Sequence, residues 1–145
     1  MTAIAYKDGV MAGDSASWQS DVLIGYHKKV FKSVDGWLVG CAGTLDCISI
    51  YREWFLSGAK GKAPRLDEMT ALIVSPQGQV FCAVAARQMR RYKLARPLAG
   101  AAIGMGHQFI MGIMAQGGTA EEAVRLAVKH VAYVAGRVYT VSLDN

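Results

Sequence analysis

Thr2 is the residue with the most direct potential for chemistry, because it becomes the first residue of the chain once Met1 is removed. Its small side chain is of the kind that methionine aminopeptidases accept, so no propeptide is needed. A threonine hydroxyl is a weak nucleophile, and the free α-amino group of a chain-terminal threonine can act as its base. A neighbouring positive charge would lower the pKa of that amine and leave more free base at neutral pH. If Met1 stays, Thr2 is an ordinary backbone position.

Other polar residues have ordinary interpretations when each is taken alone. Asp14 follows Gly13 and is typical of a turn, and Lys29 lies in a β-rich run where lysines are usually solvated. The cysteines lie among apolar neighbours without paired spacing, which favours buried, reduced thiols: Cys41, Cys47 and Cys82. The histidines are scattered without metal-ligand spacing: His27, His107 and His130. We therefore expect no metal and no cofactor.

Composition indicates one globular domain over residues 1–145, since 52% of the residues are hydrophobic and 19% are charged. No apolar stretch approaches the roughly 20 residues that span a bilayer, and the first ten residues lack the features of a signal peptide. These observations predict a cytoplasmic protein with no membrane association.

The formal charge of +5 comes largely from one cluster: Arg87, Arg90, Arg91, Lys93 and Arg96. Because Tyr92 lies among these cations, the segment suits RNA or an acidic partner. A solvated connector between two strands is the favoured interpretation, and nucleic acid is an unlikely ligand.

Periodicity predicts strands first and helices later. The Asp8-Gly9 pair predicts a tight hairpin of residues 3–6 with 10–13. After a loop, a second hairpin joins 22–32 to 36–43, and a third joins 71–75 to 80–85. Helices are predicted from the Thr44 cap to Ser57, over 106–116 and over 120–135. A short apolar run at 97–104 and a last strand at 137–143 complete an α+β layered fold.

Several segments follow one another along the chain: TAIA with AGD, HKKV ahead of GWLVGCAGT, ALIVSPQGQVFCAV, AAIGMG and TAEEAVRLA. In this order they resemble proteasome β subunits and the bacterial two-ring ATP-dependent peptidase, which are N-terminal-nucleophile hydrolases. No single motif is specific, so the order and spacing carry the resemblance, which spans nearly the whole chain. It implies a four-layer αββα sandwich with antiparallel sheets between helices.

The resemblance also implies roles for individual residues. Thr2 would be the nucleophile, Lys29 the nearby cation and Asp14 the partner that orients Lys29. The backbone N–H near Gly43 would stabilise the oxyanion during amide hydrolysis through an acyl-enzyme. Two further residues that follow Asp14 are possible supports, although a polar loop needs no such reason: Ser15 and Ser17.

Three positions depart from the pattern of active family members. The middle residue of the Gly-x-Gly turn is usually serine and is Met105 here. An aspartate and a serine three residues later usually end the last helix, and Val131 and Val134 align there. Methionine and valine cannot relay a proton. If the alignment is off by one turn, Tyr133 or Thr140 would substitute.

The resemblance implies peptide or unfolded-protein substrates, self-association into a ring and an ATP-dependent unfoldase as partner. The chain is shorter than usual after the first helix, at residues 57–68, where relatives form ring contacts. Three functions therefore remain open: a threonine endopeptidase, a catalytically silent relative with a structural or partner-binding role, and a basic binding module.

Overall fold

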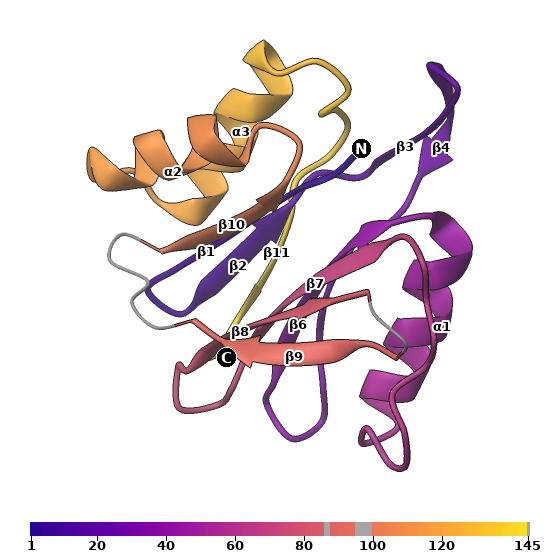
Figure 1. The fold of residues 1–145 in the computed structure, drawn as a ribbon. Coiled ribbons are helices and arrows are strands. Elements are labelled where there is room, and N and C mark those ends of the chain that lie inside the picture. Colours follow the sequence, from indigo (N-terminus) through magenta and orange to yellow (C-terminus); the bar gives the residue numbers. More distant parts are fainter. Residues whose placement is uncertain (86–87, 95–99, 145) are drawn as a thin grey trace.

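The computed structural model describes residues 1–85, 88–94 and 100–144. These residues form eleven strands and three helices (Figure 1). The strands are β1 (Ala3–Lys7), β2 (Val10–Gly13), β3 (Ala16–Gln19), β4 (Val22–Tyr26), β5 (Val30–Lys32), β6 (Leu38–Gly43), β7 (Met69–Val74), β8 (Val80–Val84), β9 (Arg90–Lys93), β10 (Ala101–Gly104) and β11 (Tyr139–Ser142). The helices are α1 (Leu45–Leu56), α2 (His107–Ala115) and α3 (Ala120–His130).

One sheet has the strand order β10-β1-β2-β11 and is antiparallel throughout. The predicted hairpin of β1 and β2 is confirmed, and its turn residues Asp8 and Gly9 both have positive φ. Helices α2 and α3 pack on one face of this sheet, where Ala3, Ala5 and Ala12 meet Ile110 and Val124. The small alanines let the helices approach the strands that carry the N-terminus.

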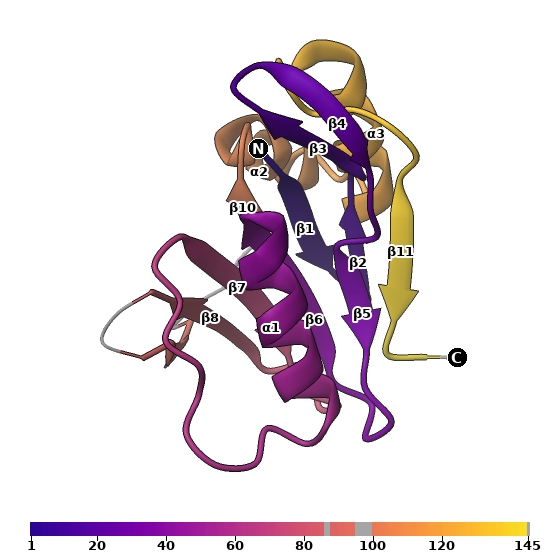
Figure 2. The same cartoon turned by 90° about the vertical axis from the view of Figure 1, so that its right-hand side faces the viewer.

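The second large sheet has the order β5-β6-β7-β8-β9 and is also antiparallel. The predicted N-terminal cap of α1 is confirmed, because the Thr44 side chain accepts a hydrogen bond from the Cys47 N–H. The helix also ends before Ser57, as predicted. Tyr51 and Phe55 of α1 pack on this sheet. The other face meets the first sheet through a cluster that includes Ile4 and Leu72 (Figure 2). The fold is thus an α+β sandwich.

The structure corrects several predictions. Residues 22–32 are not one strand of the second predicted hairpin, because β5 pairs with β6 while β4 pairs with β3. Residues 14–21 are not a loop, because β3 pairs with β4 as a separate two-stranded hairpin. The basic segment that we expected to be a solvated connector between two strands contains β9, which is itself an exposed edge strand. Arg87 and Arg96 of this segment lie outside the described residues. Helix α3 ends at His130 because Val131 adopts an extended conformation, which leaves the predicted 131–135 part outside the helix.

The three cysteines are free, but only Cys41 is buried, whereas Cys47 and Cys82 are half-buried. Every helix within the described ranges is too short or too polar to cross a lipid bilayer.

Candidate active site

Asp14 and Lys29 form an ion pair in the interior, although Asp14 alone favoured a turn and Lys29 alone favoured a solvated strand position. Lys29 Nζ lies 3.1 Å from Asp14 Oδ1, and the two side chains are 2% and 0% exposed. The ammonium group also donates to the carbonyl oxygens of Ala16 at 2.7 Å and Met1 at 3.3 Å. Its three protons therefore have three acceptors, which is what a buried ammonium group requires.

Asp14 also organises the backbone around the pair. Its Oδ1 accepts the Ala3 N–H at 3.0 Å, and its Oδ2 accepts the Ala135 N–H at 3.3 Å. The Asp14 N–H in turn donates to the Ala3 carbonyl at 3.2 Å. One carboxylate thus joins the start of β1, the end of β2 and the segment after α3.

Thr2 is only 3% exposed and is held on both sides of its peptide unit. Its carbonyl oxygen accepts the Met105 N–H at 2.6 Å, and the next residue, Ala3, donates to Asp14. Gly104 lies so close to the Thr2 carbonyl oxygen that a Cβ there would collide with it. The turn between β10 and α2 therefore fixes the backbone of Thr2.

A cleft of roughly 440 Å³ opens beside Thr2 and Lys29. One wall is the β3–β4 hairpin, which contributes Ser17, Trp18 and Ile24, and another is the start of α1. Met1 also lines this cleft, and its side chain is 43% exposed. The N-terminal end is therefore accessible from solvent, whereas Asp14 beneath it is not.

The environment shifts the ionisation of the groups here. Burial lowers the pKa of the Met1 α-amino group, and the Lys29 charge lowers it further, while Asp14 opposes both. Burial also lowers the pKa of Lys29 and raises the pKa of Asp14, and in each case the partner's charge opposes the shift. The favourable direct contact and the backbone donors to Asp14 support an ionised pair.

The other predicted site residues lie in different surroundings. Gly43 and Ser17 line the cleft with Thr2. A Cβ on Gly43 would collide with the Glu68 carbonyl oxygen, so glycine is needed where β6 meets β7. Ser15 is buried, and its Oγ packs against Gly136 without a hydrogen-bond partner among the described residues.

Met105, Val131 and Val134, which depart from the pattern of active family members, lie near the N-terminal residues. None of the three lines the cleft. The Met105 N–H contacts Thr2, while the Met105 side chain lines a separate shallow hollow at the start of α2. The Val131 side chain packs against Gly106 in the same turn, and Val134 is buried.

Neither of the two suggested substitutes, Tyr133 and Thr140, lines the cleft. The Tyr133 ring packs edge-on against Trp18 with ring centroids 5.3 Å apart. Thr140 is exposed on β11, opposite Ala12 of β2.

Two contributors to the site were not predicted from the sequence, namely the Ala135 backbone and the wall of the cleft formed by the β3–β4 hairpin. Ala135 donates its N–H to Asp14, and Gly136 after it has positive φ. That glycine is a sequence signal of a turn at this point. The hairpin wall with Trp18 had no such signal. Within the described ranges, no three His, Cys, Asp or Glu residues gather closely enough to bind a metal ion.

Comparison with known structures identifies the architecture. The chain is similar to the Thiobacillus denitrificans BPH, a bacterial proteasome homologue, in complex with epoxomicin, with a TM-score of 0.67 and 18% identity over 99% of each chain. It is likewise similar to a second structure of Thiobacillus denitrificans BPH, with a TM-score of 0.68 and 17% identity over 99% of this chain and 98% of that one. The fold is therefore proteasome-like.

Comparison of the sequence with protein-family models finds no match, and comparison with curated proteins finds none. At 17–18% identity, the structural likeness concerns the fold. What the site does is therefore argued from its own residues.

Proposed function

We propose that this protein is an N-terminal threonine hydrolase that cleaves peptide bonds after removal of Met1. The observation that carries the proposal is the position of the Lys29 ammonium group. It lies 3.3 Å from the Met1 carbonyl oxygen, whose carbon is bonded to the Thr2 nitrogen. Once Met1 is removed, that nitrogen becomes the free amine beside a fixed positive charge. A lowered amine pKa is what a general base at neutral pH requires.

The proposed reaction begins when the Thr2 hydroxyl attacks a substrate carbonyl and passes its proton to the Thr2 amine. The negative oxygen of the tetrahedral intermediate would be stabilised by the backbone N–H near Gly43. Collapse of the intermediate transfers the proton to the leaving amine and leaves an ester on Thr2. Water activated by the same amine then releases the acyl product and regenerates the hydroxyl.

We also propose the four-layer αββα order, a homo-oligomeric ring and a cytoplasmic location. A ring would restrict the cleft to unfolded or peptide substrates and would require an ATP-driven unfoldase for folded ones. The exposed apolar side chains of the β3–β4 hairpin, Val22, Leu23, Ile24 and Tyr26, support self-association.

A specific observation favours a second candidate, a catalytically silent protein with a structural or partner-binding role. The hydroxyl and carboxyl groups expected from the resemblance are replaced by the apolar side chains of Met105, Val131 and Val134. If the Thr2 amine needs those groups to exchange protons, the buried ion pair would survive only as a structural element.

A covalent probe distinguishes the two candidates. The protein is incubated with a β-lactone, a vinyl sulfone or epoxomicin, the ligand of the similar bacterial protein, and its intact mass is measured. Thr2→Ala tests the nucleophile, and Thr140→Ala is a matched control because Thr140 is exposed on β11 and does not line the cleft.

An adduct on protein lacking Met1 that disappears in Thr2→Ala and persists in Thr140→Ala would support the hydrolase. Protein lacking Met1 that forms no adduct would favour the silent protein. Retained Met1 would be resolved by treating the preparation with a methionine aminopeptidase and repeating the incubation.

A further inference from the structure

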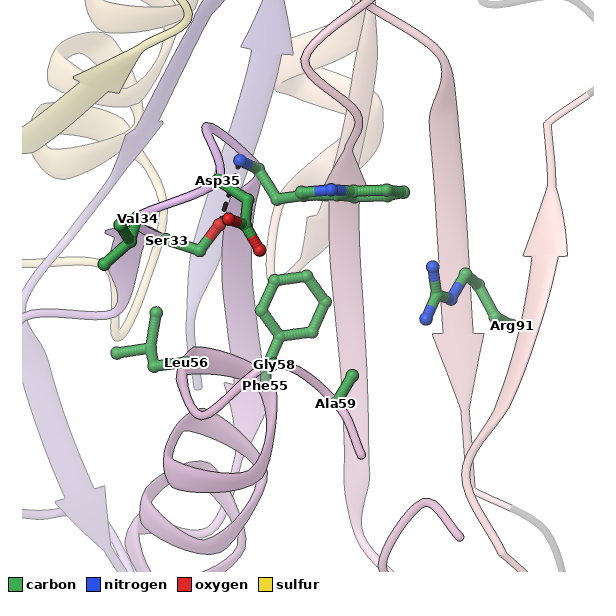
Figure 3. Close-up of a pocket in the computed structure, with 9 residues that line it drawn as sticks. Ser33, Val34, Asp35, Phe55, Leu56, Gly58, Ala59 and Arg91 are labelled. Atoms are coloured by element: carbon green, nitrogen blue, oxygen red, sulfur yellow. Dashed lines mark hydrogen bonds between the residues drawn. The ribbon is translucent and has the colours of Figure 1, made fainter. Parts of the chain in front are cut away.

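A second cavity lies on the α1 side of the five-stranded sheet, away from Thr2 (Figure 3). Its volume is about 160 Å³, and it lies between the β5–β6 turn, the C-terminal end of α1 and β9. Trp37, Phe55 and Leu56 contribute apolar side chains to its lining, and the charged side chains of Asp35 and Arg91 line it as well. An apolar cavity of about 150 Å³ admits a benzene ring, so this one has room for one aromatic or branched side chain.

The walls of this cavity are fixed by hydrogen bonds. On one side, Ser33 Oγ accepts the Trp37 N–H at 3.0 Å. On the other, the Ala59 N–H donates to the Trp54 carbonyl at 3.0 Å, and Trp54 Nε1 donates to the Lys60 carbonyl at 3.1 Å. Ala59 itself has a φ of 53°, in the left-handed region that non-glycine residues seldom adopt. The hydrogen bonds on both sides hold the residues around the cavity in place.

Arg91 supplies a positive charge without a negative partner. Its guanidinium lies 5.4 Å from the Trp37 ring centre and 5.7 Å from that of Phe81. Among the described residues, the ion pairs are Asp14 with Lys29 and Glu121 with Arg125, so Arg91 has no carboxylate partner there. Stacking holds the guanidinium in place while leaving N–H donors for a ligand.

A second cation lies on the same face of β9. Because side chains alternate along a strand, Lys93 shares the Arg91 face, whereas Arg90 and Tyr92 lie on the opposite face. The register agrees, since Arg91 and Lys93 are opposite Ala83 and Phe81, which belong to the apolar cluster under α1. Arg91 thus lines the cavity, and Lys93 lies two residues along the same face of β9.

We propose that this cavity docks an acidic peptide segment that carries one aromatic or branched aliphatic side chain. The apolar side chain enters the cavity against Trp37 and Phe55, and an adjacent carboxylate pairs with Arg91 in the bidentate geometry that guanidinium groups favour. The site is independent of the Thr2 chemistry, because the two cavities share no lining residue.

The same observations disfavour nucleic acid as the ligand. A single-stranded nucleic acid needs a row of cations that follows its backbone, whereas Arg91 is the cation among the residues that line this cavity. A peptide can direct a carboxylate toward Arg91 and a backbone N–H toward the Asp35 carboxylate, which a row of phosphates cannot do.

Binding of a fluorescein-labelled peptide, Glu-Asp-Phe-Asp-Glu, is measured by fluorescence anisotropy at 150 mM salt in Thr2→Ala protein, which excludes cleavage. Arg91→Glu should weaken binding about tenfold or more, because it replaces a charge-assisted contact with repulsion. Arg90→Glu is the matched control, since it makes the same charge change one residue away on the opposite face. Replacing phenylalanine of the peptide by alanine should also cost about tenfold.

Ala59→Leu is a second variant that places extra atoms in the cavity without removing a charge, and it should weaken binding to the same degree. Thermal melting checks that each variant is folded. The proposal is overturned if no saturable binding occurs up to millimolar peptide, or if Arg90→Glu weakens binding as much as Arg91→Glu. It is also overturned if the alanine peptide binds equally well, or if poly(U) RNA displaces the peptide at lower concentration than unlabelled peptide does.

Discussion

The Asp14–Lys29 pair is the residue-level feature on which the N-terminal region depends. Both side chains are almost completely buried, so each charge relies on the other and on the hydrogen bonds around it. Asp14→Asn keeps the size of the side chain but leaves Lys29 without a counter-charge. We expect the free energy of unfolding, measured by urea denaturation, to fall by about 3–5 kcal/mol.

The control for this substitution is Asp67→Asn, because Asp67 is exposed before β7 and should change stability by less than about 0.5 kcal/mol. The double variant Asp14→Asn with Lys29→Met should recover part of the loss, since no unpaired charge remains buried. A loss for Asp14→Asn no larger than that for Asp67→Asn would mean that the pair is not buried as described.

We expect Lys29 also to set the pH at which the proposed catalytic amine of Thr2 becomes a base. Burial lowers the pKa of the Met1 amine, the Lys29 charge lowers it further, and Asp14 opposes both. We expect the same two charges to act on the Thr2 amine once Met1 is removed. In Lys29→Met the lowering charge is lost and Asp14 acts unopposed, so both changes raise the amine pKa. The rate of adduct formation with a β-lactone needs the free amine, so its pH profile should move to higher pH.

Lys28→Met is the matched control, because Lys28 is the exposed neighbour of Lys29 and loses the same charge. Its pH profile should stay in place. A Lys29→Met profile that coincides with that of Lys28→Met would refute the role of Lys29 at the amine. Intact-mass measurements over a series of pH values give both profiles.

At the residue scale, Thr2, Asp14 and Lys29 could be predicted together only because their order along the chain resembles that of proteasome β subunits. Residue type alone favoured a turn for Asp14 and a solvated strand for Lys29, because an isolated buried lysine is costly. Its burial becomes acceptable through acceptors that tertiary structure provides, including the carbonyl oxygens of Met1 and Ala16. Such acceptors leave no trace in local sequence.

At the scale of elements, strong local signals predicted structure well. The Asp8-Gly9 turn, the Thr44 cap and the Thr119–Glu122 capping box are all present. The β3–β4 hairpin was missed because its turn, Ser20-Asp21, has positive φ at both residues without a glycine to indicate it. Strand β9 was missed because an exposed edge strand has no apolar alternation. Helix α3 was predicted too long because residues 131–135 remain mostly apolar after it ends.

The turn between β10 and α2 gives an element-level prediction for the site. A Cβ on Gly104 would collide with the Thr2 carbonyl oxygen, and φ at Gly104 is 89°, a conformation that alanine disfavours. Gly104→Ala should therefore displace the start of β1, lower the melting temperature and slow adduct formation at Thr2. Differential scanning calorimetry and the covalent probe measure the two effects.

Gly112→Ala, in the neighbouring helix α2, is the control for Gly104→Ala, and we expect it to raise stability rather than lower it. Gly112 lies in α2, and a Cβ at this position would meet no neighbouring atom within 4 Å, so alanine should stabilise the protein by about 0.5–1 kcal/mol. It should leave the rate of adduct formation unchanged. If Gly104→Ala behaves like Gly112→Ala, the turn does not hold Thr2.

At the scale of the whole molecule, the β3–β4 hairpin stands apart from the two larger sheets. It forms a two-stranded sheet of its own and extends from the body of the fold (Figure 1). Its apolar side chains Val22, Ile24 and Tyr26 are 62%, 51% and 61% exposed. An isolated two-stranded hairpin is only marginally stable in water, so covering this surface would stabilise it.

In the proposed assembly the hairpin would connect the contact between copies with the candidate active site, because Ile24 also lines the cleft beside Thr2. Ile24→Lys places a charge in the apolar surface that we propose to be covered by a second copy of the chain. We expect wild-type protein to self-associate and Ile24→Lys to shift the population toward monomer in sedimentation velocity experiments. Val34→Lys is the control, since Val34 is 100% exposed on the distant β5–β6 turn and should not alter assembly. A wild-type protein that sediments as a monomer, or equal dissociation by both variants, would show that self-association does not use this hairpin, and the ring would then require another surface.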